Sequence, residues 1–407
     1  MSDRKFDVVL FGATGFTGKL VAEYLSKHGP KDLRWCIAGR NQEKLEAVRR
    51  DLGLGDLPIR IADGHDEKAL EALVPETRTV CTTVGPYAKH GVLLARIAAK
   101  SGTHYCDLTG EPQFIRRSID ENHETARKSG ARIVHTCGFD SIPFDLGVFL
   151  LWENAKKTGA KGLRWAKGFI GPMKGGFSGG TIASMAVLFD EATKDKGVRR
   201  LLGDPHGLDP VRPGRTEDPF EQDQRTIRFD PDIERWTAPF LMATVNTRVV
   251  RRSNALVPGH YGDGFKYQES MSLMRGPKGF AVATGITAAL GGFAAALAFP
   301  PTRKMITNRL KPGDGPSKEA RDAGYFKATF VGETDDGRKI RARVEGDGDP
   351  GYSETAKMLG ESALCLARDD GKLPKEPGAG VLTPATAMGM ALVDRLRTAG
   401  MRLDVVE

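Results

Sequence analysis

The sequence predicts an α/β protein with an N-terminal Rossmann-type parallel sheet and a second domain of mixed α/β structure. Three observations predict this fold class. Apolar runs alternate with helical segments from residue 8 to residue 136, a glycine turn joins the first run to the first helix, and the pattern changes from residue 159 onward. Strands that alternate with helices form a parallel sheet covered on both faces, and its ligands lie beyond the carboxyl ends of the strands.

A glycine turn follows the first strand, expected at 8–11, and precedes a helical segment at 19–28. Its seven residues are Gly12, Ala13, Thr14, Gly15, Phe16, Thr17 and Gly18. Glycines spaced in this way allow a tight turn and a close approach of the backbone to a pyrophosphate, which then lies at the positive end of the helix. We therefore predict that these residues bind a dinucleotide; the alternative is a glycine-rich turn without a ligand.

The residue after the second strand, expected at 33–38, indicates which dinucleotide binds. NAD-dependent enzymes usually have an acidic residue there that binds a ribose hydroxyl, whereas this chain has Arg40. A guanidinium pairs with a 2′-phosphate through two parallel hydrogen bonds, so we predict NADP(H) as the cofactor. The alternative for Arg40 is a solvated charge at a strand end. Asp63, at the end of the third strand, is a candidate acceptor for the adenine amino group.

The remaining elements of the first domain follow in order, each strand as an apolar run and each helix as a longer periodic segment. The expected helices are 42–52, 67–73, 89–100 and 112–129, and the expected strands are 58–62, 79–84, 104–108 and 131–136. Polar side chains together with glycine or proline follow the last three strands, in the segments 84–87, 107–111 and 137–143. Because these strand ends meet at one edge of a parallel sheet, we expect the reactive centre there.

Three side chains in these segments are candidate catalytic residues. Tyr87 is a candidate proton donor, although no tyrosine of the chain has the lysine four positions later that short-chain dehydrogenases use; its alternative role is packing beside the nicotinamide. Asp140 is a candidate acid or substrate-orienting group, and its alternative is a helix cap before Pro143. Glu111 also precedes a proline and has the same two interpretations. Gly85, in the first segment, is expected to contact the cofactor.

We expect three parts of the chain: an NADP-binding Rossmann domain at 1–150, a substrate and dimerisation domain at 151–380, and a C-terminal helix and tail at 381–407 that pack back on the core. The second part has an expected strand at 163–170, a helix at 182–192, a long loop at 203–230 that is a candidate lid, and a hairpin at 326–344. Helices are expected at 353–367 and 384–398. The glycine turn at 175–180 contains Ser178 in the Gly-x-Ser-x-Gly pattern of hydrolases. Two other interpretations fit the turn better: its backbone N–H groups bind a substrate oxygen, or the turn is purely structural.

The segment 279–302 carries no charge, and Lys278, Arg303 and Lys304 flank it. It is long enough to cross a bilayer, but it is rich in alanine and glycine and places its larger apolar residues on one helical face. Three interpretations stay open: a helix buried in the protein or in a dimer interface, a helix that lies on a membrane surface, and a true span.

The composition limits the class of protein and its partners. Hydrophobic residues make up 40% and charged residues 28% of the 407 residues, as in folded soluble proteins, and the net charge of +8 favours anionic partners. The basic residues are spread along the chain without a nucleic-acid-binding motif, so we expect no nucleic-acid partner. Five cysteines without a Cys-x-x-Cys pair, the lack of metal-ligand spacing and an N-terminus without room for a signal peptide predict a reduced, cytoplasmic protein with no metal site.

Seven segments together resemble the saccharopine-dehydrogenase-like oxidoreductases, and most closely the branch of trans-acting enoyl reductases. These segments are 12–18, 38–40, 83–87, 107–111, 137–143, 351–362 and 380–384, and they span nearly the whole chain. The stretch 203–230 is the least similar to the family.

The resemblance implies a Rossmann domain that binds NADP and the reduction of a carbon–carbon double bond in a polyketide-derived lipid precursor held on a synthase. Hydride would pass to the β-carbon of an unsaturated acyl thioester, and water or an acid such as Tyr87 would protonate the α-carbon. We expect an acyl carrier or polyketide synthase as partner, a homodimer, and contact with a membrane or lipid droplets through 279–302. Two alternatives stay open: an NADP-dependent dehydrogenase of an amino acid or imine, and a non-catalytic lipid-associated scaffold that binds a nucleotide.

Overall fold

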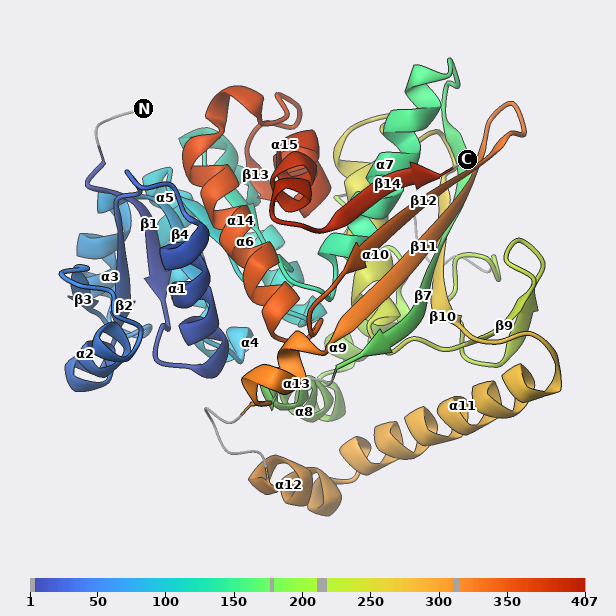
Figure 1. Ribbon diagram of the computed structural model, residues 1–407, viewed down its shortest axis with the longest axis horizontal. Helices are drawn as coiled ribbons and strands as arrows, with labels where there is room; N and C mark the ends of the chain where they lie inside the picture. Colours follow the sequence, from blue (N-terminus) through green and yellow to red (C-terminus); the bar gives the residue numbers. More distant parts are fainter. Residues whose placement is uncertain (1–3, 176–178, 211–217, 310–314, 407) are drawn as a thin grey trace.

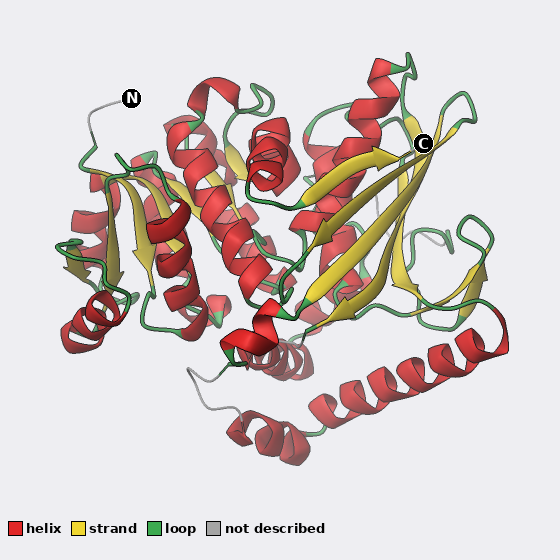
Figure 2. Ribbon diagram, in the orientation of Figure 1, coloured by secondary structure: helices red, strands yellow, loops and turns green. Residues whose placement is uncertain are grey.

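The computed structural model describes residues 4–175, 179–210, 218–309 and 315–406. Two seven-stranded sheets lie side by side, and helices cover them and connect them (Figures 1 and 2). The first sheet is parallel throughout and the second is mixed, as the sequence predicts. Ser178 lies outside the described residues.

The first sheet has the strand order β13-β6-β5-β4-β1-β2-β3, which is the order of a doubly wound Rossmann sheet extended by one strand. Its strands are β1 (Phe6–Phe11), β2 (Trp35–Gly39), β3 (Ile59–Ile61), β4 (Thr77–Thr82), β5 (His104–Cys106), β6 (Arg132–Val134) and β13 (Gly380–Leu382). Its helices are α1 (Phe16–His28), α2 (Gln42–Asp51), α3 (Glu67–Leu73), α4 (Tyr87–His90), α5 (Val92–Ser101), α6 (Pro112–Ser129) and α14 (Ser353–Arg368). The central strand β1 is buried along its whole length, because helices cover both faces of the sheet.

The second sheet has the strand order β14-β12-β11-β7-β10-β9-β8. Its strands are β7 (Leu163–Lys174), β8 (Arg228–Asp230), β9 (Arg235–Ala238), β10 (Lys266–Ser272), β11 (Tyr325–Thr334), β12 (Lys339–Gly346) and β14 (Arg402–Val406). The other helices are α7 (Ile142–Lys157), α8 (Gly179–Lys194), α9 (Lys196–Gly203), α10 (Ala243–Leu256), α11 (Gly276–Ala298), α12 (Pro300–Arg309), α13 (Lys318–Asp322) and α15 (Pro384–Thr398). Short 3₁₀ turns occupy Val74–Glu76 and Asp370–Lys372.

The helix α7 packs closely on the second sheet. The strands β11 and β12 bury one face, with alternating residues Ala328, Phe330, Ala342 and Val344 pointing to the helices. A Cβ added to Gly147 of α7 would lie 2.3 Å from the ring of Phe330, so only glycine allows this approach. The core of the second sheet therefore begins within the first 150 residues of the chain.

The chain does not divide between the two sheets at residues 150 and 380, where we expected the domain boundaries. The helix α7 belongs to the second sheet, whereas α14 packs on β1, β4 and β5 of the Rossmann sheet, and β13 pairs with β6 at its edge. The tail adds β14 to the second sheet beside β12. The chain thus returns to each sheet, which local patterns do not indicate because the pairing partners are far apart in sequence.

The expected lid at 203–230 is fastened to α10 by buried arginines. Arg251 donates to the backbone oxygens of Glu221 (2.7 Å) and Tyr267 (2.6 Å). Arg252 donates to the backbone oxygens of Leu208 and, at 2.7 Å, Val381. Because a buried guanidinium that loses these acceptors is left unpaired in the core, the described parts of this loop form a fixed cover instead of a loose lid.

A buried carboxylate, Asp145 of α7, joins three helices. It accepts from Ser253 Oγ of α10 at 2.5 Å and from the backbone N–H of Ala385 in α15 at 2.7 Å. Burial raises the pKa of Asp145 to about 7, and the hydrogen bonds from Ser253 and Ala385 oppose this shift.

We expect Asp145 to make the fold less stable as the pH rises. A carboxyl with a raised pKa in the folded state contributes its full stability below its unfolded pKa and loses it as the pH rises to about 7, by about 4 kcal/mol at most. The Asp145→Asn variant should therefore gain stability relative to the natural protein between pH 4.5 and 7.5, as measured by urea unfolding. Asp51→Asn, on an exposed residue, is the control; parallel pH curves for Asp145→Asn and the natural protein would contradict the assignment.

Candidate active site

The glycine turn has the geometry that a dinucleotide requires. Gly12 has a φ of 94°, and a Cβ there would lie 2.5 Å from Val84 Cγ2. A Cβ on Gly18 would lie 2.2 Å from the backbone oxygen of Gly12. Gly15 caps α1 without a side-chain hydrogen bond, so the first N–H groups of the helix stay available to an anion. The turn therefore fits the pyrophosphate of a dinucleotide.

The other residues of the turn hold it in place or line it. Ala13 is buried, whereas Thr14 and Thr17 are half-buried. The ring of Phe16 meets the ring of Tyr352 edge to face at 4.9 Å, and Tyr352 accepts from the backbone N–H of Gly179 at the start of α8. The glycine turn thus contacts the start of α14 and, through Tyr352, is connected to α8; the sequence pattern connects neither element with the turn.

The residue that we predict to bind the 2′-phosphate of NADP(H), Arg40, lies at the end of β2. Arg40 is exposed and makes no hydrogen bond within the described residues, while Asn41 caps α2 by accepting from the N–H of Lys44 at 2.9 Å. Asp63 Oδ1 accepts from the N–H of His65 at 2.9 Å, so part of its carboxylate holds its own loop. His65 Nε2 lies 2.9 Å from His90 Nδ1 and joins the loops after β3 and β4. A free guanidinium beside a helix start fits an added phosphate.

Tyr87 and Glu111 form the support of the loop after β4. The Tyr87 hydroxyl is buried, donates to the backbone oxygen of Thr82 (3.3 Å) and accepts from the N–H of Leu108 (3.3 Å). Burial raises the pKa of Tyr87 well above 10, and the nearby Asp107 adds to the shift. These contacts support the packing interpretation of Tyr87, since its hydroxyl is engaged inside the protein.

The Glu111 carboxylate caps α4 instead of its own helix. It accepts from the N–H groups of Tyr87 and Ala88, each at 2.8 Å, and from Ser184 Oγ of α8 at 2.7 Å. Burial raises the pKa of Glu111, and these three hydrogen bonds oppose the shift. Gly85 lies next to Ser184, since a Cβ added to Gly85 would be 4.0 Å from Ser184 Oγ. Glu111 therefore joins the Rossmann loops to α8.

Asp140 differs from the other two candidates because its carboxylate makes no hydrogen bond within the described residues. The cap of α7 is Ser141, whose hydroxyl donates to Asn246 Oδ1 at 2.9 Å, so the expected cap role of Asp140 is wrong. Asp140 is half-buried, and burial raises its pKa to about 6. A Cβ on Gly110 would lie 3.7 Å from Asp140 Oδ2, which places this carboxyl beside the loop after β5. The arrangement provides a carboxyl group that can be protonated near neutral pH.

The loop that carries Asp140 is fixed on both sides. The N–H of Phe139 donates to Thr355 Oγ1 of α14 at 3.1 Å, and Asn246, which accepts from Ser141, donates in turn to Glu269 of β10 at 2.7 Å. The family-like segment 351–362 therefore acts here by positioning this loop.

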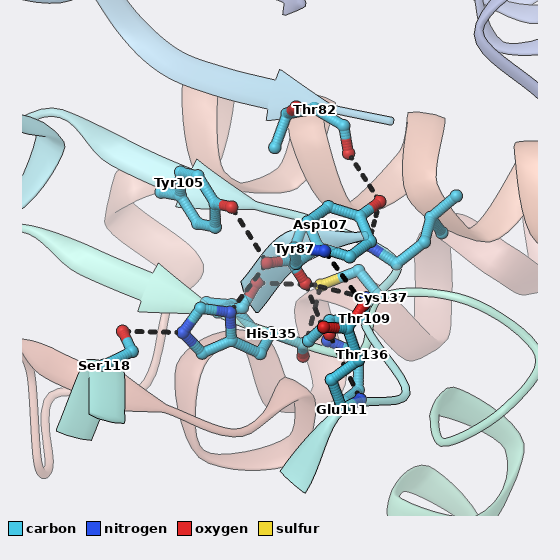
Figure 3. Close-up of polar contacts among 12 residues, drawn as sticks. Thr82, Tyr87, Tyr105, Asp107, Thr109, Glu111, Ser118, His135, Thr136 and Cys137 are labelled. Atoms are coloured by element: carbon cyan, nitrogen blue, oxygen red, sulfur yellow. Dashed lines mark hydrogen bonds and ion pairs between the residues drawn. The ribbon is translucent and has the colours of Figure 1, made fainter. Parts of the chain in front are cut away.

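A buried polar network under the strand ends was missed by the sequence analysis (Figure 3). Asp107 Oδ2 accepts from Tyr105 OH at 2.9 Å and from His135 Nδ1 at 2.7 Å, and its Oδ1 accepts from the N–H groups of Thr109 (3.0 Å) and Thr136 (3.2 Å). His135 Nε2 lies 2.8 Å from Ser118 Oγ. The order Ser-His-Asp resembles a catalytic triad, but all three side chains are buried, so the network supports the loops. The sequence signal that could have predicted this network is the pair Asp107 and His135, two polar residues that directly follow neighbouring strands.

The N-terminus of α1 adds positive character to this edge of the sheet. Gly15 precedes α1 and has no side chain to cap it, so the N–H groups of the first turn favour an anionic group there. The N-terminus of α7 differs, because Ile142 already donates to the backbone oxygen of Gly138 (3.0 Å) and Phe144 to that of Ser141 (3.1 Å). The described residues hold no cluster of three or more His, Cys, Asp and Glu side chains that is suited to a metal ion.

The fold and this edge define an NADP-dependent oxidoreductase with a Rossmann domain. Residues 8–134 match the family model of the saccharopine dehydrogenase NADP-binding domain. Over 98% of its length the chain is 45% identical to a putative trans-acting enoyl reductase of Mycobacterium tuberculosis, of which 97% is covered, and 39% identical over the same shares to a trans-acting enoyl reductase of Mycobacterium bovis. The chain belongs to the family of trans-acting enoyl reductases within the saccharopine-dehydrogenase-like oxidoreductases.

A solved structure supports the fold. The apo, histidine-tagged saccharopine dehydrogenase (L-Glu forming) of Saccharomyces cerevisiae superposes with a TM-score of 0.54 at 15% identity, over 98% of this chain and 99% of that one. This likeness concerns the fold alone. It confirms the predicted fold class, while the family model and the full-length relatives confirm the predicted family and cofactor.

We expect Arg40 to determine the preference for NADPH over NADH. Replacing it by alanine removes a charge-assisted pair with the 2′-phosphate, so the Kd for NADPH should rise about tenfold or more while the Kd for NADH stays the same. Fluorescence titration of both nucleotides measures this. Arg50→Ala, on an exposed residue of α2, is the control. An equal loss for both nucleotides would assign the 2′-phosphate to other residues.

Proposed function

We propose that this protein reduces the α,β carbon–carbon double bond of an acyl thioester presented by the carrier domain of a polyketide synthase. The names of its full-length relatives support the reaction class, and the word trans-acting in those names supports a substrate held on another protein. The observation that carries the proposal is the carboxyl of Asp140, half-buried, without a hydrogen bond within the described residues, and with a pKa of about 6.

The reaction requires a hydride and a proton at neighbouring carbons. NADPH, held by the glycine turn and Arg40, supplies the hydride when bound. The α-carbon then needs a proton, and Asp140 is the candidate donor since its carboxyl is protonated below about pH 6. Tyr87 and Glu111 act as positioning residues in this proposal, because their polar atoms already hold the loops after β4 and β5.

The wider context of the reaction is also a proposal. The net charge of +8 would attract an acidic carrier protein, and the five cysteines are free and buried, as expected for a cytoplasmic protein. The predicted role in lipid biosynthesis and the homodimer belong to the same proposal. Incubation with enoyl and imine substrates separates it from the amino-acid or imine dehydrogenase alternative, and failure to oxidise NADPH with either would favour the scaffold.

We expect Asp140→Asn to lower kcat for an enoyl thioester at least about a hundredfold, because a positioned general acid contributes an effect of that size. In the natural protein, kcat should fall as the pH rises above about 6, where Asp140 loses its proton, and the variant should lose this dependence. Loss of NADPH absorbance measures the rate.

Two comparisons make the test specific. Tyr87→Phe removes a hydroxyl that is engaged inside the protein, so it should reduce kcat much less than Asp140→Asn. NADPH binding should be the same in all three proteins. If Tyr87→Phe removed the activity and Asp140→Asn retained it, the proton donor would be Tyr87 and the role assigned to Asp140 would be overturned.

A further inference from the structure

Large exposed apolar side chains gather along α11 and its neighbours. Nine such side chains are exposed in the described parts of the chain, and six of them belong to this region. They are Phe229 (50% exposed), Met274 (49%), Phe280 (48%), Val282 (39%), Phe299 (59%) and Met305 (51%). Patches of this kind on a folded protein mark a surface that binds a partner or a membrane.

The helix α11 is apolar although it lies outside the core. Its most apolar window has a mean hydropathy of 1.8, and only 11% of that window is buried. Figures 1 and 2 show α11 along one rim of the molecule, with its start beside β9 of the second sheet. It is anchored near its start, where the rings of Trp236 and Phe280 meet at 5.0 Å, and beyond its end, where Arg303 of α12 pairs with Asp190 of α8 at 3.0 Å. Burial in the core of the chain, one of the three interpretations, is therefore wrong.

The sheet topology excludes a single membrane span. The strand β10 precedes α11 and β11 follows it, and both pair with β7 in the same sheet. One crossing would place β10 and β11 on opposite sides of the bilayer and break this sheet. The helix α12 has ten residues, too few to cross back, since a span needs about 20. An exposed apolar helix that does not cross the bilayer lies either along a membrane surface or against a partner protein.

The charges around α11 favour lipid over a second copy of the chain. Residues 276–309 carry Lys278, Arg303, Lys304 and Arg309 and no acidic residue, so the charges of this segment at both ends of the apolar stretch are positive, with Asp190 of α8 paired to Arg303. A second copy packed along α11 in either direction would bring like charges together. Anionic headgroups complement both ends, while acyl chains accept the apolar middle and the aromatic rings.

We propose that α11, with the exposed side chains named above, binds the surface of an anionic lipid bilayer and lies in its interface without crossing it. This surface lies near the candidate active site, because α8 contacts both α11 and α12, and Ser184 of α8 donates to Glu111. The reactive edge would then lie close to a membrane surface. The surface proposal itself stands independently of the reaction proposed above.

The test uses the purified full-length chain and vesicles of phosphatidylcholine, with or without about 30% phosphatidylglycerol, in a cosedimentation assay. The natural protein should bind the anionic vesicles and bind less as salt increases. Phe280→Ser combined with Phe299→Ser should weaken binding about tenfold or more, since two exposed aromatic anchors are lost. Lys278→Gln should weaken binding to the anionic vesicles only.

A matched control removes two exposed apolar side chains elsewhere: Ile61→Ser combined with Val405→Ser should bind like the natural protein. Retained NADPH binding shows that each variant is folded. No binding of the natural protein to either vesicle, or equal losses in both double variants, would overturn the proposal. Light scattering without vesicles measures the oligomeric state. If the natural protein were a dimer that bound no vesicles, and if the Phe280 and Phe299 double variant were a monomer, this surface would be a homodimer interface instead.

Discussion

The Asp107 carboxylate is the constraint on which the reactive edge depends. It accepts four hydrogen bonds from the ends of β5 and β6 and the loops that follow them, and it is fully buried. One donor is the N–H of Thr136, whose φ of 62° is unfavourable for a threonine. The bond to Asp107 helps hold this bend, and the bend directs the next residues toward the loop that carries Asp140. A carboxylate inside the sheet thus sets the position of a carboxyl at its edge.

The two sheets form one structure because the chain passes between them repeatedly. Asp145 of α7 joins α10 and α15, Arg252 of α10 reaches the backbone of β13, and Thr355 of α14 holds the loop before α7. The bond from Arg252 joins a helix of the second sheet directly to a strand of the Rossmann sheet, and the bonds to Asp145 join three helices that pack together. Such buried bonds are expensive to break, so they hold the loops around the site in place.

The apolar helix α11 shows how topology limits what composition allows. Length and hydropathy alone are compatible with a span, and the same pattern suits a buried helix. The pairing of β10 and β11 with one strand, β7, removes the first interpretation, and the exposure of the helix removes burial in the core. Only a view of the sheet and the helix together could separate these cases.

The sequence by itself determined the features that depend on local chemistry. The turn 12–18, the alternation of strands and helices, and Arg40 at the end of β2 each lie within one strand–turn–helix unit, so spacing and residue type predicted the Rossmann sheet and the cofactor. Only the tertiary structure decided the rest, because it depends on partners far apart in the chain. Glu111 caps α4 and not α6, the hydroxyl of Tyr87 turns inward, and Asp140 is left without a hydrogen bond among the described residues. The pairing of β13 with β6 and of β14 with β12 likewise joins segments far apart in the chain, and local sequence patterns do not predict which distant strands pair.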